Sequence, residues 1–267
     1  MSLTITILGC GSSGGVPRVG QGWGACDPTN PKNRRRRCSI LVERAAETDG
    51  AATNLLVDTS PDLRDQLLDT GVARLDGIVL THLHADHTHG IDDVRPLVIH
   101  MRRRIDVFMD AVTSAVVSHR FDYIFQTPPG SQYPAICNER RIVDGQDFEI
   151  AGPGGAISVT PFRLDHGDID AMGLRFGACA YTPDVIAIPE ASRRFLVDLD
   201  LWIIDALRYA RHPTHLSLAE ALEWIDRLKP RRAVLTNMHT DLDYEGLRQN
   251  LPAHIEPAYD GMRLSIS

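Results

Sequence analysis

The sequence has no long hydrophobic run. None of its apolar stretches approaches the ~20 residues that a membrane-spanning helix needs. Its first residues, MSLTITILGCGSSGG, also lack the basic region and apolar core of a signal peptide, and they read as a strand. We therefore expect a protein that begins at or near Met1, has no membrane partner and works in the cytoplasm.

Cysteine pairs and an excess of positive charge are missing as well. The five cysteines are scattered and form no CxxC pair, which argues against a disulfide framework and against a cysteine-only zinc site. We expect all five to be buried or half-buried thiols. The formal net charge is −7, so composition offers no electrostatic argument for binding nucleic acid, and we expect no nucleic-acid partner.

Repeats, low-complexity segments and linkers are absent too. Hydrophobic residues make up 43% of the 267 positions, enough for a substantial core. Strand-like segments with hairpin turns come first, and strands then alternate with helical patterns in each half. This order predicts mixed sheets flanked by helices and packed as one domain over residues 1–267.

The periodicity also predicts individual elements. A polar, glycine-containing stretch at 47–53 suits a hairpin turn, Ser217 with Glu220 marks a helix start, and 121–140 has no readable pattern. The predicted helices are 61–70, about 89–100, 188–195, 217–228 and 244–249. The predicted strands are 3–8, 39–42, 54–58, 77–81, 105–109, 146–150, 156–164, 174–181, 201–205, 233–236 and 263–266.

Four of the eleven histidines fall within eight residues, in and just after the segment THLHADH. His82 and His84 can chelate one ion, and Asp86 and His87, further round the turn, can face a second. Imidazole nitrogens and carboxylate oxygens suit Zn²⁺, Mn²⁺ or Fe²⁺. One four-coordinate ion cannot use so many ligands, which favours two metals. His89 breaks the spacing, and we interpret it as a supporting or helix-start residue.

THLHADH resembles the THxHxDH motif of the metallo-β-lactamase superfamily. The resemblance covers nearly the whole chain, because later motifs follow in the family's order. It implies an α/β (α+β) fold, a four-layer αββα sandwich of two mixed β-sheets flanked by helices. The metals of that fold lie between the edges of the two sheets.

The resemblance extends to four further positions. Asp58, at the end of LLVD, matches the early acidic residue that supports the metal ligands, and His166 in LDHG matches the next metal histidine. Asp184 in AYTPD matches the carboxylate that bridges both ions, and His239 in LTNMH matches the last histidine. The family often places that last ligand two residues earlier, where this chain has Asn237.

The resemblance therefore implies two divalent ions, Zn²⁺ or Mn²⁺, with one ligand set for each and Asp184 bridging them. The first set is His82, His84 and His166, and the second is Asp86, His87 and His239.

Ligand identity narrows the branch of the superfamily. Oxygen-reducing di-iron members carry a glutamate where this chain has His84, and true β-lactamases commonly alter the Asp–His pair and use a cysteine in the second site. Here Asp86 and His87 are intact, and Cys179 lies five residues from Asp184. We expect neither redox chemistry nor lactamase activity.

Two other segments resemble the phosphodiesterase branch. His215 in HPTHLS resembles its HxxHL element, in which a histidine protonates the leaving oxygen, although a plain helix flank is the alternative reading. LGCGSSGGVP resembles the opening of the phosphoribosyl cyclic-phosphate phosphodiesterases of the phosphonate pathway. Its glycine-rich turn either exposes N–H groups to an anion or is only a tight turn after the first strand.

The same comparison exposes two departures. Those cyclic phosphodiesterases carry a small structural zinc site with clustered cysteines in this region, whereas only Cys26 stands here, so we predict that this zinc is absent. The basic run at 34–37 is either a solvated face or a source of one or two bidentate contacts to substrate phosphate, and no single arginine stands out.

The sequence as a whole predicts a binuclear metal-dependent phosphodiesterase for a small cyclic or nucleotide-like diester. The expected nucleophile is a hydroxide shared by the two metals, which Asp184 also bridges. His215 is the expected general acid, and Asp58 is expected to orient a metal-binding histidine. The alternatives are a tRNA 3′-processing endonuclease, whose long basic arm has no counterpart here, and a glyoxalase II-type thioesterase, which needs no HxxHL element. An accessory protein like that of pyrroloquinoline quinone biosynthesis is a further alternative, disfavoured by the complete ligand set. A homodimer is expected from the family's example.

Overall fold

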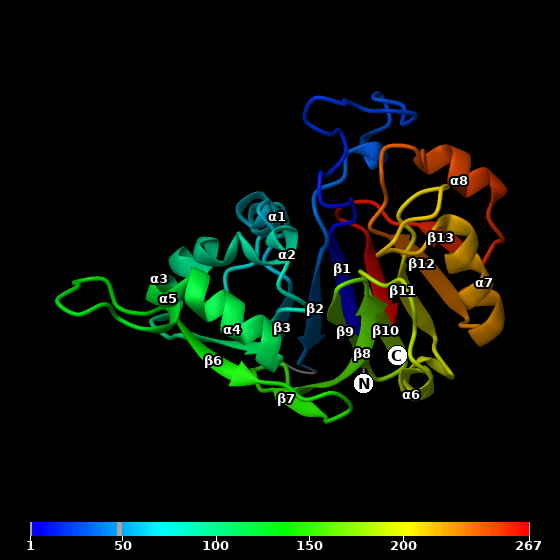
Figure 1. Cartoon of the computed structure of the whole chain (residues 1–267). Coiled ribbons are helices and arrows are strands. Elements are labelled where there is room, and N and C mark those ends of the chain that lie inside the picture. The colour runs from blue at the N-terminus through cyan, green and yellow to red at the C-terminus, as the bar shows by residue number, and fades with distance from the viewer. Residues whose placement is uncertain (1, 47–49, 267) are drawn as a thin grey trace.

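Two seven-stranded sheets face each other in the computed structural model, which describes residues 2–46 and 50–266 (Figure 1). The first sheet runs in the order β14 (Arg263–Ile266), β1 (Leu3–Gly9), β2 (Ser39–Ala45), β3 (Ala52–Val57), β4 (Gly77–Val79), β5 (Ile105–Met109) and β6 (Cys137–Arg141). The second runs in the order β13 (Ile255–Pro257), β12 (Arg232–Thr236), β11 (Leu201–Asp205), β10 (Cys179–Thr182), β9 (Ile169–Phe176), β8 (Ile157–His166) and β7 (Phe148–Ile150).

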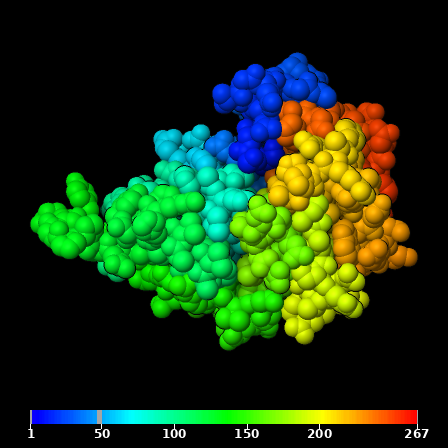
Figure 2. All heavy atoms as spheres, in the orientation of Figure 1, coloured from blue at the N-terminus to red at the C-terminus, as the bar shows by residue number. Residues whose placement is uncertain are grey.

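Helices cover the outer faces of both sheets and complete the predicted αββα layers (Figure 1). Five helices lie beside the first sheet: α1 (Leu63–Thr70), α2 (Ala85–Thr88), α3 (Arg95–Met101), α4 (Ala111–Arg120) and α5 (Asp122–Phe125). Three lie beside the second: α6 (Glu190–Arg193), α7 (Leu218–Leu228) and α8 (Tyr244–Asn250). No helix in the described ranges is both long enough and apolar enough to cross a bilayer. The loop after α5 projects from the body of the molecule (Figure 2).

The central strands β3 and β4 of the first sheet bury side chains on both of their faces. Along β3, Leu55 and Val57 join the core between the sheets, whereas Leu56 packs with the core under the helices. Successive side chains of a strand point to opposite faces, so a continuous apolar run fills two layers at once. Each such side chain contributes about 1.5–3 kcal/mol by burial. The rigid strand ends that result carry the functional residues.

Residues 10–37, between β1 and β2, cross the segment that follows β12. The Ser12 N–H donates to the Met238 carbonyl at 3.2 Å, and the Met238 N–H donates to the Cys10 carbonyl at 2.9 Å. The Arg35 guanidinium, 1% exposed, donates to the Leu242 carbonyl at 2.7 Å. The beginning and the end of the chain are thus joined beside the sheet edge.

The structure confirms most of the predicted elements and corrects two. The strand predicted over 174–181 is wrong, because Gly177 adopts a positive φ of 58° and makes the turn between two antiparallel strands, β9 and β10. The helix predicted around 89–100 is broken, with a 3₁₀ segment at Ile91–Val94 before α3. Of the hairpin turn predicted over 47–53, residues 47–49 lie outside the described residues, and β2 and β3 on either side pair antiparallel. All five cysteines are buried thiols.

Candidate metal centre

The candidate site gathers at one edge of the two sheets. Asp58 follows β3 and the motif 82–87 follows β4, the parallel neighbour of β3. In the second sheet Asp184 follows β10, and Asp205 ends the parallel strand β11. Because the carboxyl ends of parallel neighbours meet at the same edge, residues far apart in the sequence converge there.

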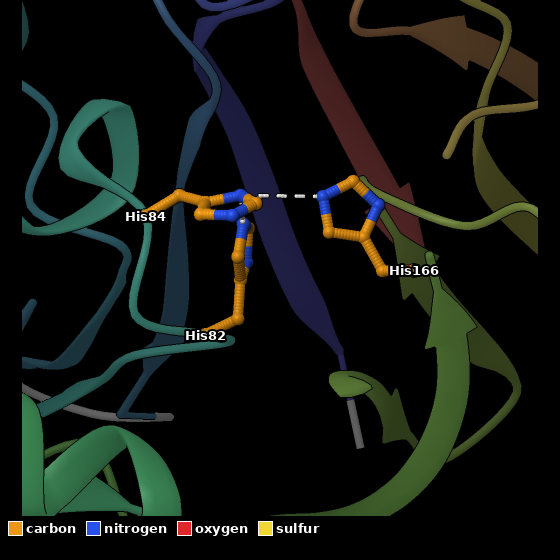
Figure 3. A group of neighbouring side chains, drawn as sticks. All are labelled: His82, His84 and His166. Atoms are coloured by element: carbon orange, nitrogen blue, oxygen red, sulfur yellow. Dashed lines mark hydrogen bonds between the residues drawn. The ribbon is translucent and has the colours of Figure 1, made fainter. Parts of the chain in front are cut away.

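Three histidine rings point at one another (Figure 3). Nε2 of His82 lies 3.1 Å from Nδ1 of His84, and Nε2 of His166 lies 3.3 Å from that same nitrogen. Nδ1 of His166 donates to the Thr214 carbonyl at 2.7 Å, which leaves the lone pair on its Nε2. Convergent imidazole nitrogens at this spacing suit a transition-metal ion.

A second group with ligand spacing consists of His82, His87 and Asp184. Nε2 of His87 lies 3.2 Å from Oδ2 of Asp184, and Asp86 Oδ2 lies 3.4 Å from the same nitrogen. Nε2 of His87 and Oδ2 of Asp184 are buried, and neither has a partner with hydrogen-bond geometry among the described residues. Orphaned buried polar atoms are rare in native proteins, and a divalent cation coordinated by both would satisfy them.

Asp58 binds the ring nitrogen of His87 that faces away from Asp184. Its Oδ2 accepts from His87 Nδ1 at 2.8 Å, and its carboxylate also accepts from the Thr81 N–H at 2.8 Å and from the Thr81 hydroxyl. Burial raises the pKa of Asp58. Burial lowers the pKa of His87, but Asp184, Asp58 and Asp86 outweigh it and raise that pKa well above its ordinary value. The pocket collects negative charge that a cation would offset.

His215 forms a matching pair with Asp205, a residue that sequence reasoning missed. Nδ1 of His215 donates to Asp205 Oδ2 at 2.9 Å, which leaves Nε2 for the cavity that His215 lines. Burial raises the pKa of Asp205 to about 7. Burial lowers the pKa of His215, but Asp205 raises it to about 9, so the imidazole holds a proton more tightly than the carboxyl does. The sequence could have indicated Asp205 by its position, because it ends a buried strand just as Asp58 follows one.

A third group with ligand spacing consists of His166, Asp184 and His215. His239 lies on the same cavity but outside the three groups found in residues 2–46 and 50–266. Its Nε2 contacts the Arg18 guanidinium, and its Nδ1 lies 3.1 Å from the Thr240 hydroxyl. Its backbone N–H donates to the Leu207 carbonyl at 2.8 Å. The structure therefore brings His239 to the site with its ring turned to an arginine.

The cavity itself measures about 240 Å³, and its lining includes Arg18 and Arg208, neither of which was predicted. The basic run at 34–37 is placed elsewhere. Arg35 is buried, and Arg36 and Arg37 form ion pairs with Asp69 and Asp62. Arg34 and Arg36 line a different cavity, and Arg37 lines a groove beside the metal cavity.

Comparison with known proteins agrees with this fold. A family model described as "Beta-lactamase superfamily domain" matches residues 53–238. The crystal structure of a new diphosphatase from the PhnP family superposes with a TM-score of 0.88 at 36% identity, covering 100% of this chain and 98% of that one. Zn²⁺-bound PqqB from Methylobacterium extorquens shares the fold, with a TM-score of 0.74 at 18% identity over 98% of this chain and 99% of that one.

Curated relatives match over only part of their length. An octanoyltransferase of Porphyromonas gingivalis is 32% identical over 97% of this chain and 51% of its own length. A ribonuclease Z of Bradyrhizobium is 26% identical over 55% of this chain and 46% of its own length. The chain thus spans about half the length of these relatives. With the family match and the shared fold, it belongs to the metallo-β-lactamase superfamily, among the PhnP-like metal-dependent hydrolases.

Proposed function

We propose that the protein is a binuclear phosphodiesterase acting on a small cyclic or nucleotide-like diester. The observation that carries this proposal is one cavity lined by members of the metal-spaced groups, His84, His166 and Asp184, and by His215, whose Nδ1 binds Asp205. The ligands that we assign are His82, His84 and His166 for one ion, Asp86, His87 and His239 for the other, and Asp184 between them.

The donor set fits two Zn²⁺ or Mn²⁺ ions, because it consists of imidazoles and carboxylates and includes the orphaned atoms of His87 and Asp184. Such ions lower the pKa of bound water and offset charge on phosphoryl oxygens. Asp58 orients His87 and keeps its Nε2 available as a ligand.

His215 is the proposed general acid. Asp205 holds Nδ1, so the proton available to substrate is on Nε2, and the pKa of about 9 keeps the ring protonated at neutral pH. As the phosphorus–oxygen bond breaks, this proton passes to the departing alkoxide and leaves neutral imidazole. The carboxylate of Asp205 stabilises the charged ring before transfer.

A small substrate fits the cavity better than tRNA does. The projecting loop at 126–134, QTPPGSQYP, contains no lysine or arginine and therefore offers no electrostatic grip on a phosphate backbone. We further propose a single-domain protein in the cytoplasm and, from the family's example, a homodimer.

The test is metal analysis of the purified protein combined with assays on cyclic and linear phosphodiesters. We expect two ions per chain and hydrolysis of at least one diester, with His84→Ala losing both metal and activity. Parallel assays with S-lactoylglutathione and precursor tRNA cover the alternatives. Two bound ions with turnover of the thioester alone would reject the phosphodiesterase.

A further inference from the structure

The Arg35 guanidinium is buried without an acidic partner. The residue is 1% exposed, and no carboxylate oxygen lies within ion-pair distance of it in residues 2–46 and 50–266. Its neighbours Arg36 and Arg37, by contrast, pair with aspartates. Taking a charge out of water costs free energy that an ion pair would partly offset and that an apolar side chain would not incur. The contribution of Arg35 therefore lies in the hydrogen bonds that its planar fork directs.

Those hydrogen bonds span one turn of the chain. Nη2 donates to the Leu242 carbonyl at 2.7 Å, and Nη1 donates to the His239 carbonyl at 3.4 Å and also contacts Cys26 Sγ. The Leu242 N–H donates to the same His239 carbonyl at 3.2 Å and closes the turn 239–242. A guanidinium presents its N–H groups in a fixed geometry, so a single side chain holds both ends of this turn.

Arg35 is itself held in place. Its backbone exchanges two hydrogen bonds with Val16, of 2.9 and 2.8 Å. The side-chain oxygen of Asn33 accepts from Nη2 at 3.3 Å and from the Tyr244 N–H at 2.8 Å. The two segments that meet here, 10–37 and the chain between β12 and α8, lie side by side (Figure 1). Arg35 therefore joins a hydrogen-bonded part of the first segment to the turn in the second.

His239 begins this turn and lines the metal cavity. Its backbone N–H donates to the Leu207 carbonyl at 2.8 Å, while its carbonyl accepts from Arg35 and Leu242. Because the peptide groups on both sides are held, the imidazole moves only by rotation about the bonds of its own side chain. The guanidinium thus keeps His239 at the cavity, where we have assigned it to the second ligand set.

We propose that Arg35 is a positioning residue for the second metal ion, because it holds the turn that presents His239 to the cavity. This inference rests on the proposed binuclear site, in which His239 is a ligand of that ion. The ion assigned to His82, His84 and His166 takes no ligand from the turn. Loss of the guanidinium should therefore weaken one metal site and spare the other.

Metal affinity of Arg35→Met tests the assignment. Competition between the Zn²⁺-loaded protein and a chromophoric chelator gives an affinity for each ion. Arg35→Met should hold one ion within about threefold of the wild-type affinity and bind the other about 10–100-fold more weakly, the usual cost of removing a residue that orients a ligand. The control is Arg36→Met, which removes the neighbouring guanidinium and its ion pair with Asp69 and should bind both ions as the wild type does. Wild-type affinity for both ions in Arg35→Met would overturn the assignment.

A double-mutant cycle with His239→Ala separates positioning from a general loss of stability. If Arg35 acts through His239, adding Arg35→Met to His239→Ala should change neither metal affinity by more than about threefold. A further loss in the double variant would assign Arg35 to the fold alone. Retention of both ions by His239→Ala would reject the ligand assignment and the inference with it. The expected metal affinities without hydrolysis of any diester would instead reject the proposed activity and leave the positioning role intact.

Arg35→Lys covers the case in which the methionine variant does not fold. Lysine keeps the charge but not the fork, so it cannot span both carbonyls of the turn. The same selective loss of one ion is expected. Equal loss of both ions, or failure of both variants to fold, would show that Arg35 serves the fold and would overturn the positioning role.

Discussion

Each sheet contributes one buried aspartate–histidine pair to the site. In the first sheet Asp58 follows β3 and binds Nδ1 of His87 at 2.8 Å, and in the second Asp205 ends β11 and binds Nδ1 of His215 at 2.9 Å. Both carboxylates are fully buried. The two pairs differ in the surroundings of the histidine Nε2 atom.

Nε2 of His87 is enclosed with Asp184, whereas the side chain of His215 is 14% exposed on the cavity. The carboxylate of Asp58 also accepts hydrogen bonds from Thr81, while Oδ1 of Asp205 has no hydrogen-bond partner within 2–46 and 50–266. The same local device can therefore serve a metal ligand or a proton donor, and the neighbours of Nε2 decide which. The variants below separate the two uses.

Among these variants, removing His215 should have the largest effect on turnover. His215→Ala is expected to lower turnover of a cyclic nucleotide by about 10²–10⁴-fold, because the leaving alkoxide loses its proton donor. Metal content, measured on the same sample, should not change. An unaltered rate on the cyclic substrate would remove His215 from the mechanism, and an activated aryl ester is unsuitable here because its leaving group needs little protonation.

A third aspartate, Asp260, is half-buried and pairs with no histidine in residues 2–46 and 50–266. Asp260 accepts from the backbone N–H groups of Cys10 and Arg36, and burial raises its pKa to about 7. The folded state thus holds a proton that the unfolded state has already released above pH ~4. Stability from this group is full at low pH and is lost as pH rises towards 7, by up to ~4 kcal/mol.

Asp260→Asn should flatten that slope. The measurement is the free energy of unfolding in urea at several values between pH 4 and 8, for wild type and variant side by side. If the difference between the two proteins does not vary with pH, Asp260 does not titrate in this range.

Weakening the Asp58–His87 pair should lower the affinity for metal. Asp58→Asn keeps the size of the side chain but removes the charge that orients His87, and we expect metal affinity to fall by about 10–100-fold. Competition with a chromophoric chelator gives the affinity. Activity should return at high metal concentration, and failure to recover would indicate a misfolded site.

The smallest change in activity is expected from Asp205→Asn, the equivalent substitution in the second sheet. Asp205→Asn should reduce turnover by about tenfold, because the amide can still accept from His215 Nδ1 but no longer stabilises its charge. Metal affinity should stay at the wild-type value. If Asp205→Asn released metal as Asp58→Asn is expected to, the proposed division of labour between the two pairs would be wrong.

Much of this architecture could be predicted from the sequence, because THLHADH concentrates its donors in one turn. The fold followed from the family's motif order and from buried strands such as 201–205, which the structure reproduces residue for residue. Asp58 could be singled out because its place at the end of LLVD matches the early acidic residue of the family.

Other features depend on contacts that a linear sequence does not contain. Asp205 differs from a capping aspartate only through its proximity to His215, which comes from a loop ten residues later. Arg18 and Arg208 lie far apart in the sequence but line the same cavity. The more conspicuous basic run at 34–37 instead contributes an ion pair from Arg36 and a hydrogen bond from Arg35 to a buried carbonyl. The hairpin at Gly177 was missed because the apolar pattern continues across it.

The crossing of residues 10–37 with the segment after β12 has a consequence for how the protein is made. The histidines of THLHADH leave the ribosome early, but Ser12 cannot bond to Met238 until almost all of the chain has been synthesised. Closing so large a loop costs conformational entropy that only the complete second sheet can offset. A nascent chain that ends before Met238 would therefore expose the histidines of THLHADH without the segments that enclose them, and the site is complete only after the strand β12 and the segment that follows it have been synthesised.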